Sequence, residues 1–104
     1  MIARSWRGRT TIANQNAYID HFRTNVLPEL RGIDGFVGAT LLKEESAGEV
    51  AFLVLTQWKS KDAIRAFAGA DIQRAVVEPE AARVLLSFDA TVQHWEVVDS
   101  GPGS

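Results

Sequence analysis

The chain has 104 residues, of which 46% are hydrophobic, and this suits one domain with a core of its own. With 11 basic and 13 acidic residues the formal net charge is −2, which argues against a nucleic-acid binder because such a protein needs a basic face. The absence of cysteine excludes disulfides, thiolate chemistry and cysteine-ligated metal sites. We find no secretory signal and no apolar run long enough to span a bilayer, so we expect a cytoplasmic protein that does not bind membranes.

The N-terminal part of the sequence predicts a strand followed by a kinked helix. Residues 2–8 alternate between two sets of side chains, and Ile2, Arg4 and Trp6 share one face of the predicted strand. Further on, apolar side chains recur at every fourth position and form the stripe of an amphipathic helix: Tyr18, Phe22, Val26 and Leu30. Pro28 lacks a backbone N–H and crowds the preceding turn, so we expect a kink or a restarted short turn at this point.

Two strands joined by a short turn follow this helix. Residues 36–44 and 49–58 have the composition of strands, and the turn at residues 46–48 lies between them. Such a short connection makes an antiparallel hairpin, and it disfavours the alternative of a doubly wound parallel sheet.

The C-terminal half predicts helices and a final strand. Ser60 is a suitable N-cap for one helix, and further helical stretches are expected over residues 71–77 and 80–86. Residues 91–98 form the last predicted strand. Residues 99–104 are expected to be a disordered tail, because they contain nothing that can be buried.

The predicted order of elements is strand, helix, strand, strand, helices, strand. Two β-α-β crossovers with right-handed connections then give a ferredoxin-like βαββαβ fold of the α+β class. In this fold the helices cover one face of a four-stranded antiparallel sheet. We assign residues 1–98 to this single domain.

The third predicted strand is apolar on both of its faces. Val50 and Phe52 lie on one side, whereas Leu53 and Leu55 lie on the other. A strand that is exposed on one side alternates polar with apolar residues, so we expect this strand to be covered on both sides. The helices can cover one face only, and a homodimer through the other sheet face is the simplest cover. The alternative is a monomer with an open apolar patch, which monomers rarely keep.

Six segments, taken in order, carry a resemblance to a known family. They are VLPEL at residues 26–30, IDGF at 33–36, FLVLTQWKS at 52–60, AFAG at 66–69, AVVEPEA at 75–81 and HWEVV at 94–98. On these segments residues 1–98 resemble the antibiotic biosynthesis monooxygenase family of the dimeric α/β-barrel superfamily. The resemblance implies a dimeric barrel, within a superfamily that includes cofactor-free monooxygenases, heme-degrading enzymes and members without an assigned activity.

The resemblance also allows two branches to be compared residue by residue. The heme-degrading branch has an Asn on the first strand, a Trp in the second helix and a His further on, where this chain has Trp6, Phe67 and Val76. No iron ligand remains at the expected position, so we expect no heme and no other cofactor. The cofactor-free branch surrounds an aromatic substrate with Trp, Asn, Tyr and Arg side chains, and Trp58 occupies its tryptophan position at the end of a strand.

The candidate catalytic residues are His94 and Arg4. Histidine titrates near neutral pH, so His94 on the last strand can act as a general base or orient a phenol; the alternative is a structural, hydrogen-bonded histidine. Arg4 at an inward position needs a carboxylate or a ligand anion, or else it pairs across the dimer interface. We place His21, the other histidine, at the solvent edge of its helix. No metal site is expected, because no carboxylates accompany the histidines at a suitable spacing.

The aromatic side chains are the candidate substrate-binding set: Trp6, Tyr18, Phe22, Trp58 and Phe67. They either line a cleft between helices and sheet that holds a flat apolar ligand, or they fill the core. Two functional hypotheses follow. The first is a cofactor-independent, monooxygenase-like homodimer that acts on a small aromatic or polyketide-type compound, whose anion Arg4 or His94 stabilises. The second is a non-catalytic homodimer of the same fold that binds a small ligand or has a structural role.

Overall fold

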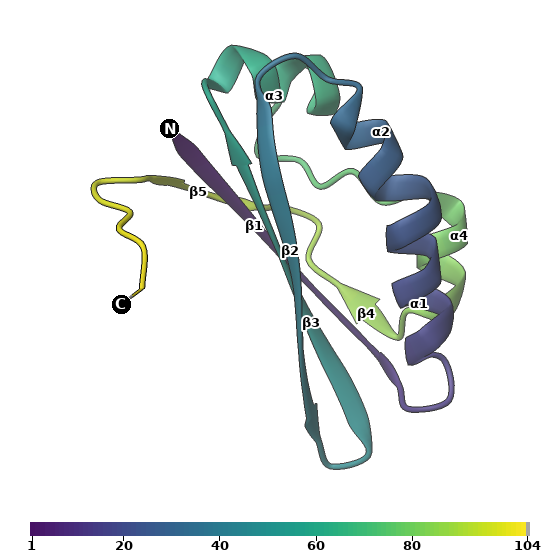
Figure 1. Ribbon diagram of the computed structural model, residues 1–104. Helices are drawn as coiled ribbons and strands as arrows, with labels where there is room; N and C mark the ends of the chain where they lie inside the picture. The colour runs from purple at the N-terminus through teal and green to yellow at the C-terminus, as the bar shows by residue number, and fades with distance from the viewer. Residues whose placement is uncertain (104) are drawn as a thin grey trace.

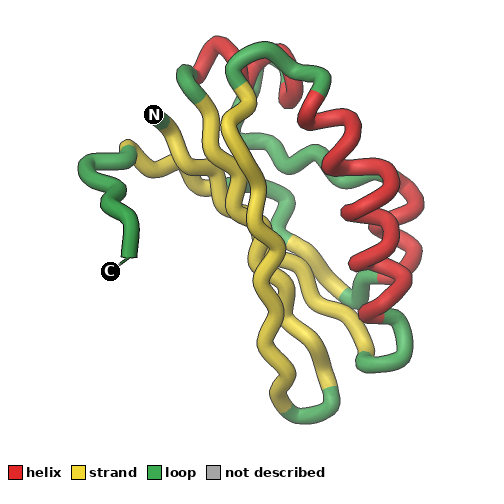
Figure 2. The backbone as a smooth tube through the Cα atoms, viewed as in Figure 1, coloured by secondary structure: helices red, strands yellow, loops and turns green. Residues whose placement is uncertain are grey.

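One antiparallel sheet with helices packed against one of its faces makes up the computed structural model, which describes residues 1–103 (Figure 1). The strands are β1 (Ile2–Thr11), β2 (Phe36–Ser46), β3 (Glu49–Trp58), β4 (Ser87–Phe88) and β5 (Gln93–Glu96). The helices are α1 (Gln15–His21), η1 (Phe22–Val26), α2 (Leu27–Arg31), α3 (Lys61–Ala68) and α4 (Pro79–Val84). Figure 2 shows all the helices on the same side of the sheet. The predicted ferredoxin-like α+β fold is confirmed.

The sheet is built around β1, which is central. Its strand order is β2-β3-β1-β4, and β5 also pairs with β1. The fourth position of the ferredoxin-like sheet is therefore shared by two short strands, where the sequence predicts one strand over residues 91–98. Strand β1 pairs with β3 from Ile2↔Trp58 to Thr11↔Glu49, so it runs past its predicted end at Gly8. Between β2 and β3 the turn residues Ala47 and Gly48 have φ angles of 53° and 78°, as a tight hairpin turn requires.

The first helical region restarts next to Pro28, which is one of the two forms of interruption that this proline predicts. Helix α1 passes into the π-helical turn η1, and Pro28 then lies in the first turn of α2. Proline cannot donate the backbone hydrogen bond that an uninterrupted helix would need, and a π-turn is one way to accommodate that loss. None of the helices in residues 1–103 is long and apolar enough to cross a membrane.

The prediction of a helix over residues 71–77 is wrong. Residues 72–73 form a turn, closed by the Arg74 N–H donating to the Asp71 carbonyl at 3.2 Å, and the chain then runs without helix beside the segment that leads to β5: Arg74 forms a β-bridge with Thr91, and the Val92 N–H donates to the Gln73 carbonyl at 2.8 Å. Two valines and the residue before Pro79 disfavour helix here, since β-branched side chains and the position before a proline prefer extended backbone. In the C-terminal segment, residues 99–103 are exposed and without helix or strand, and Ser104 lies outside the described residues.

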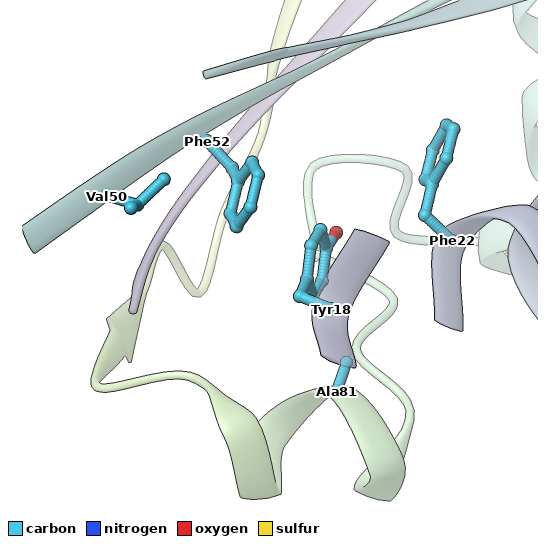
Figure 3. Close-up of a cluster of buried hydrophobic side chains, with 5 residues drawn as sticks. All are labelled: Tyr18, Phe22, Val50, Phe52 and Ala81. Carbon is cyan, nitrogen blue, oxygen red and sulfur yellow. The ribbon is translucent and has the colours of Figure 1, made fainter. Parts of the chain in front are cut away.

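The core lies between the helices and the sheet in two clusters of buried side chains. The first joins α1, η1, β3 and α4 and consists of Tyr18, Phe22, Val50, Phe52 and Ala81 (Figure 3). The second, at the other end of the helical layer, consists of Leu30, Trp58 and Ile64. The predicted cap of α3 is present, because the Ser60 hydroxyl accepts a hydrogen bond from the Ala63 N–H at 3.2 Å.

We expect Gly35→Ala to destabilise the fold more than Gly48→Ala. Both glycines have positive φ, 89° and 78°, so both variants carry the cost of a left-handed alanine, about 1 kcal/mol. At Gly35 the new Cβ would also lie 2.6 Å from the Cβ of Ala63, whereas nothing lies within 4 Å at Gly48. Urea unfolding should therefore show a loss of about 2–3 kcal/mol for Gly35→Ala. Equal losses in the two variants would contradict this account.

Candidate functional site

A cleft opens between the sheet and the helical layer. The cavity volume of the cleft is about 70 Å³, and the figure rises to about 680 Å³ only when all space between the wall atoms and the open solvent at the mouth is counted. Strand β1 contributes Arg4 and Trp6, the first helical region contributes its inward side chains, and the extended segment after α3 contributes residues 76–78. Most of the wall is apolar, which suits an apolar ligand held by a few polar contacts.

Four of the five predicted aromatic residues line this cleft: Trp6, Tyr18, Phe22 and Phe67. The Trp6 and Tyr18 rings are stacked with centroids 6.3 Å apart, and the Trp6 Nε1–H donates to the Asp89 carbonyl at 2.8 Å, which fixes the indole. Burial raises the pKa of Tyr18, so its hydroxyl stays protonated. In Figure 3 the Tyr18 ring stands against Phe52 of β3, which holds it from the sheet side.

The fifth aromatic residue, Trp58, does not line the cleft. Its side chain is fully buried, and its Nε1–H donates to the Thr56 hydroxyl at 2.8 Å. It packs edge-on against Phe36 and stacks on Phe67, with centroids 5.3 Å and 5.8 Å away. Trp58 therefore packs against Phe67 on the side away from the cleft. Direct contact between Trp58 and a ligand would require the core to open.

Arg4 is a buried cation on the wall of the cleft without a carboxylate partner. The residue is 5% exposed, and its guanidinium donates to the carbonyls of Ile72 at 2.6 Å and Arg74 at 3.0 Å. Its Nη1 lies 3.3 Å from His94 Nε2, and the Phe67 ring centroid is 5.8 Å from its Cζ. Among residues 1–103, no carboxylate oxygen lies within 4 Å of this group. Burial lowers its pKa to about 10, so it is still charged at neutral pH.

His94 lies outside the cleft, on the far side of Arg4. Its ring faces a shallow, solvent-facing recess that Lys61 and Trp95 also line. The pKa of His94 is lowered, first by burial and then by the positive charges of Arg4 and Lys61. A neutral ring can accept a hydrogen bond from the Arg4 guanidinium, so His94 is placed to hold Arg4 and does not reach the cleft itself.

His21 does line the cleft, and its predicted place at the solvent edge is wrong. The residue is 7% exposed, and its Nδ1 lies 2.9 Å from Asn25 Nδ2. Its Nε2 is buried, has no hydrogen-bond partner among residues 1–103, and lies 4.0 Å from Glu78 Oε2. The sequence does contain a signal for this placement, because His21 follows Tyr18 by three residues and so shares its helix face.

Glu78 is a second wall residue that sequence reasoning did not find. It precedes Pro79 at the start of α4, and its pKa is raised, first by burial and then by the neighbouring carboxyl of Glu29. Glu29, from α2, also lines the cleft. These groups come from separate elements, so no short motif relates them. Among residues 1–103, no three histidine, aspartate or glutamate side chains are grouped to hold a metal ion.

Comparison with known proteins places the chain in a family. Residues 1–79 match the family model described as antibiotic biosynthesis monooxygenase. The chain belongs to this family. It is also 32% identical over 94 residues to Rv2557 of Mycobacterium tuberculosis (strain H37Rv), an uncharacterised protein; the match covers 85% of this chain and 38% of that protein. The chain therefore spans little more than a third of the length of the curated relatives that it matches.

Solved structures of monooxygenases and of a heme degrader share the fold. ActVA-Orf6 of Streptomyces coelicolor, a monooxygenase in complex with nanaomycin D, has a TM-score of 0.65 at 19% identity, covering 99% of this chain and 92% of that one. SnoaB of Streptomyces nogalater, a cofactor-independent oxygenase, has a TM-score of 0.64 at 19% identity, covering 98% of each chain. The heme degrader MhuD of Mycobacterium tuberculosis, with two hemes bound, has a TM-score of 0.60 at 22% identity, covering 97% and 100%.

The residues at the family's heme positions do not fit heme in this chain. Trp6, Phe67 and Val76, which stand where the heme-degrading branch has Asn, Trp and His, do gather on the cleft wall, but none of them offers an iron ligand. The imidazole on the wall belongs to His21 of α1, and its free nitrogen faces the carboxylate of Glu78.

The raised pKa of Glu78 predicts a pH-dependent effect of Glu78→Gln on stability. Because the folded state binds this proton more tightly than the unfolded chain, wild-type stability falls as pH rises from the ordinary glutamate pKa of about 4.3 through the folded value. The variant lacks this loss, so its melting temperature should exceed that of wild type at pH 7.5, and the gap should close below about pH 4.

Glu96→Gln is the matched control for this measurement. Glu96 is an exposed residue of β5 and is not among the groups that raise the pKa of Glu78, so its replacement should leave the melting temperature close to that of wild type at pH 7.5. A gap between Glu78→Gln and wild type that widens as the pH falls would contradict the prediction.

Proposed function

We propose that this protein is a cofactor-independent, monooxygenase-like enzyme that acts on a small aromatic or polyketide-type compound with an acidic hydroxyl or enol. The observation that supports this most directly is Arg4, a buried guanidinium without a carboxylate on the wall of an aromatic-lined cleft. The family membership and the folds shared with oxygenases are consistent with it.

The charge of Arg4 explains why the ligand should be an anion when it reacts. Burying a cation is costly unless it is paired, and two backbone carbonyls compensate only part of the charge. The negative oxygen of a bound phenolate or enolate would complete the compensation. By the same interaction, Arg4 would lower the pKa of a bound hydroxyl and favour its deprotonation. His94, on the other side, would hold the guanidinium in place.

The deprotonated ligand can then react with molecular oxygen as the co-substrate. For an anthrone-like substrate, the carbanion form of its enolate adds O₂ to give a peroxide anion, which takes up a proton. Loss of one water molecule from the hydroperoxide leaves a carbonyl where the CH₂ group was. One oxygen atom enters the product and the other leaves as water, so no further reductant is needed. The apolar wall of Trp6, Tyr18, Phe22 and Phe67 would bind the ring system and limit the access of water.

A non-catalytic homodimer that binds a small ligand or has a structural role is the second candidate. The mostly apolar, aromatic wall can hold such a ligand without reacting with it. Ligand binding without oxygen consumption would favour this candidate.

We also propose that two copies pair through the sheet face that carries no helix in residues 1–103. On this face Leu53 and Leu55 of β3 lie beside Leu42 of β2, and Trp95 of β5 is 54% exposed. Basic side chains of β1 border the patch on one side, and Glu44 of β2 borders it on the other. A two-fold axis would bring the basic edge of one copy opposite the acidic edge of the other.

Oxygen uptake tests the proposed reaction. With anthrone as the probe, wild type should consume one O₂ per anthraquinone formed, without an added cofactor. Arg4→Met should lower the rate by at least about tenfold, because it removes the charge that stabilises the enolate. An oxygen electrode combined with the absorbance of the product gives the ratio of O₂ to anthraquinone and the rate. Uptake unaffected by Arg4→Met, or no uptake above the uncatalysed rate, would reject the proposal.

Light scattering tests the homodimer. Wild type should have twice the chain mass of 11.4 kDa, and Leu55→Glu should shift it to the monomer by placing a charge in the middle of the apolar patch. Ile12→Glu is the control, because Ile12 is an exposed apolar residue outside the patch, in the turn after β1. A wild-type mass of one chain at all concentrations would rule out the pairing.

A further inference from the structure

The helical side of the cleft carries a polar pair that the reaction proposed above does not use. His21 lines the cleft and is more than nine-tenths buried; its Nε2 is itself shielded from solvent, has no hydrogen-bond partner in residues 1–103, and lies 4.0 Å from Glu78 Oε2. A buried donor without a partner is rare in folded proteins and calls for a specific explanation. The pair comes from α1 and from the start of α4, whereas Arg4 comes from the sheet.

The neighbours of His21 define which of its nitrogens carries the proton. The Asn25 side-chain amide Nδ2 lies 2.9 Å from Nδ1, and an amide N–H can only donate, so Nδ1 is the acceptor and the neutral ring carries its hydrogen on Nε2. Asn25 stands four residues after His21 in the π-helical turn, which orients the imidazole from its own helix. The Nε2–H is therefore a donor that the protein leaves available.

The separation between the two groups suits a single hydroxyl. An oxygen placed about 2.8 Å from both Nε2 and Oε2 would subtend an angle of about 90° between them, which is close to the geometry of a hydroxyl that accepts one hydrogen bond and donates another. Nε2–H would donate to this oxygen, and the Glu78 carboxylate would accept its hydrogen. At 4.0 Å the two protein groups are too far apart to satisfy each other.

We propose that His21 and Glu78 bind a hydroxyl group of an aromatic ligand and that Glu78 is the base that removes its proton. This inference rests on the proposed function and names the class of substrate more closely, as a hydroxylated aromatic compound. In this deprotonation the proton passes from the ligand oxygen to the Glu78 carboxylate, and the electron pair stays on the ligand oxygen. His21 Nε2–H then stabilises the phenolate oxygen that forms.

The other charged groups around the pair are compatible with this role. Burial raises the pKa of Glu78, a hydrogen bond with Glu29 of α2 and the negative charges of Glu29 and Glu80 raise it further, and His21 acts in the opposite direction. A carboxylate whose pKa is raised is a stronger base, so proton transfer from a phenol is less unfavourable than to an ordinary glutamate. Arg4, across the cleft on β1, supplies the positive charge that balances the anion.

A pair of matched probes tests the inference: 2-naphthol and its methyl ether, 2-methoxynaphthalene. Both have the same ring system, but the ether cannot donate a hydrogen bond. We expect wild type at pH 7 without oxygen to bind the naphthol at least about tenfold more tightly, as measured by ligand fluorescence. Glu78→Gln and His21→Asn should each reduce this preference to below about threefold. Because the preference is a ratio of two affinities, a variant that weakens the binding of both probes equally leaves the preference unchanged.

Glu96→Gln is the control, because it makes the same chemical change on β5, outside the cleft wall and away from the groups that shift the pKa of Glu78. Its preference should equal that of wild type. Glu78 is partly exposed, so Glu78→Gln should fold and decides the matter even if His21→Asn does not. A wild type without the preference, a preference kept in Glu78→Gln, or no binding of either probe at its solubility limit would overturn the inference.

Oxygen uptake separates this result from the proposed reaction. A preference for the naphthol that depends on Glu78, together with no oxygen consumption, would support the hydroxyl site and reject the oxygenase. Oxygen consumption without the preference would support the oxygenase and reject the hydroxyl site.

Discussion

The hydrogen bonds from Arg4 to the carbonyls of Ile72 and Arg74 join the sheet to the segment that completes the cleft. A helix over residues 71–77 would use the Ile72 carbonyl for its own hydrogen bond, so this segment cannot be helical and still direct that carbonyl at a side chain on β1. Its extended course then carries residues 76–78 onto the cleft wall. The buried charge, the irregular backbone and the shape of the site therefore depend on one another. Loss of the guanidinium would leave these two carbonyls without their donors, and it would also remove the positive charge from the cleft wall.

Most of the fold could be predicted because it follows from regular periodicity. The two-residue alternation in β1 and β3 and the four-residue stripe from Tyr18 to Leu30 are local patterns that the structure retains. The error over residues 71–77 has a different origin, since the backbone there is determined by a contact with Arg4, which lies far away in the sequence. Similarly, residues 87–88 pair with β1 only because α4 returns the chain to its edge.

The candidate site could be predicted in part for the same reason. Arg4 and Trp6 were identifiable because a charge at an inward strand position is unusual, and alternation alone reveals it. Trp58 has the same aromatic character, but its indole is satisfied by Thr56 inside the core, and sequence does not show that. The pairing of His21 with Glu78 joins residues that are 57 positions apart by their numbers, and only the packing of α1 against α4 brings them together.

The π-helical turn at Phe22–Val26 has a consequence for how this helix tolerates changes in length. A π-turn holds more residues than an α-helical turn, so it behaves as an inserted residue that the helix has absorbed. Deleting one residue from it would let α1 and α2 join as one regular helix, and everything before the deletion would rotate by about 100° relative to α2. Tyr18 and His21 would then turn away from the sheet while Leu30 stayed in place. The number of residues in this single turn thus sets the direction of Tyr18 and His21 relative to that of Leu30.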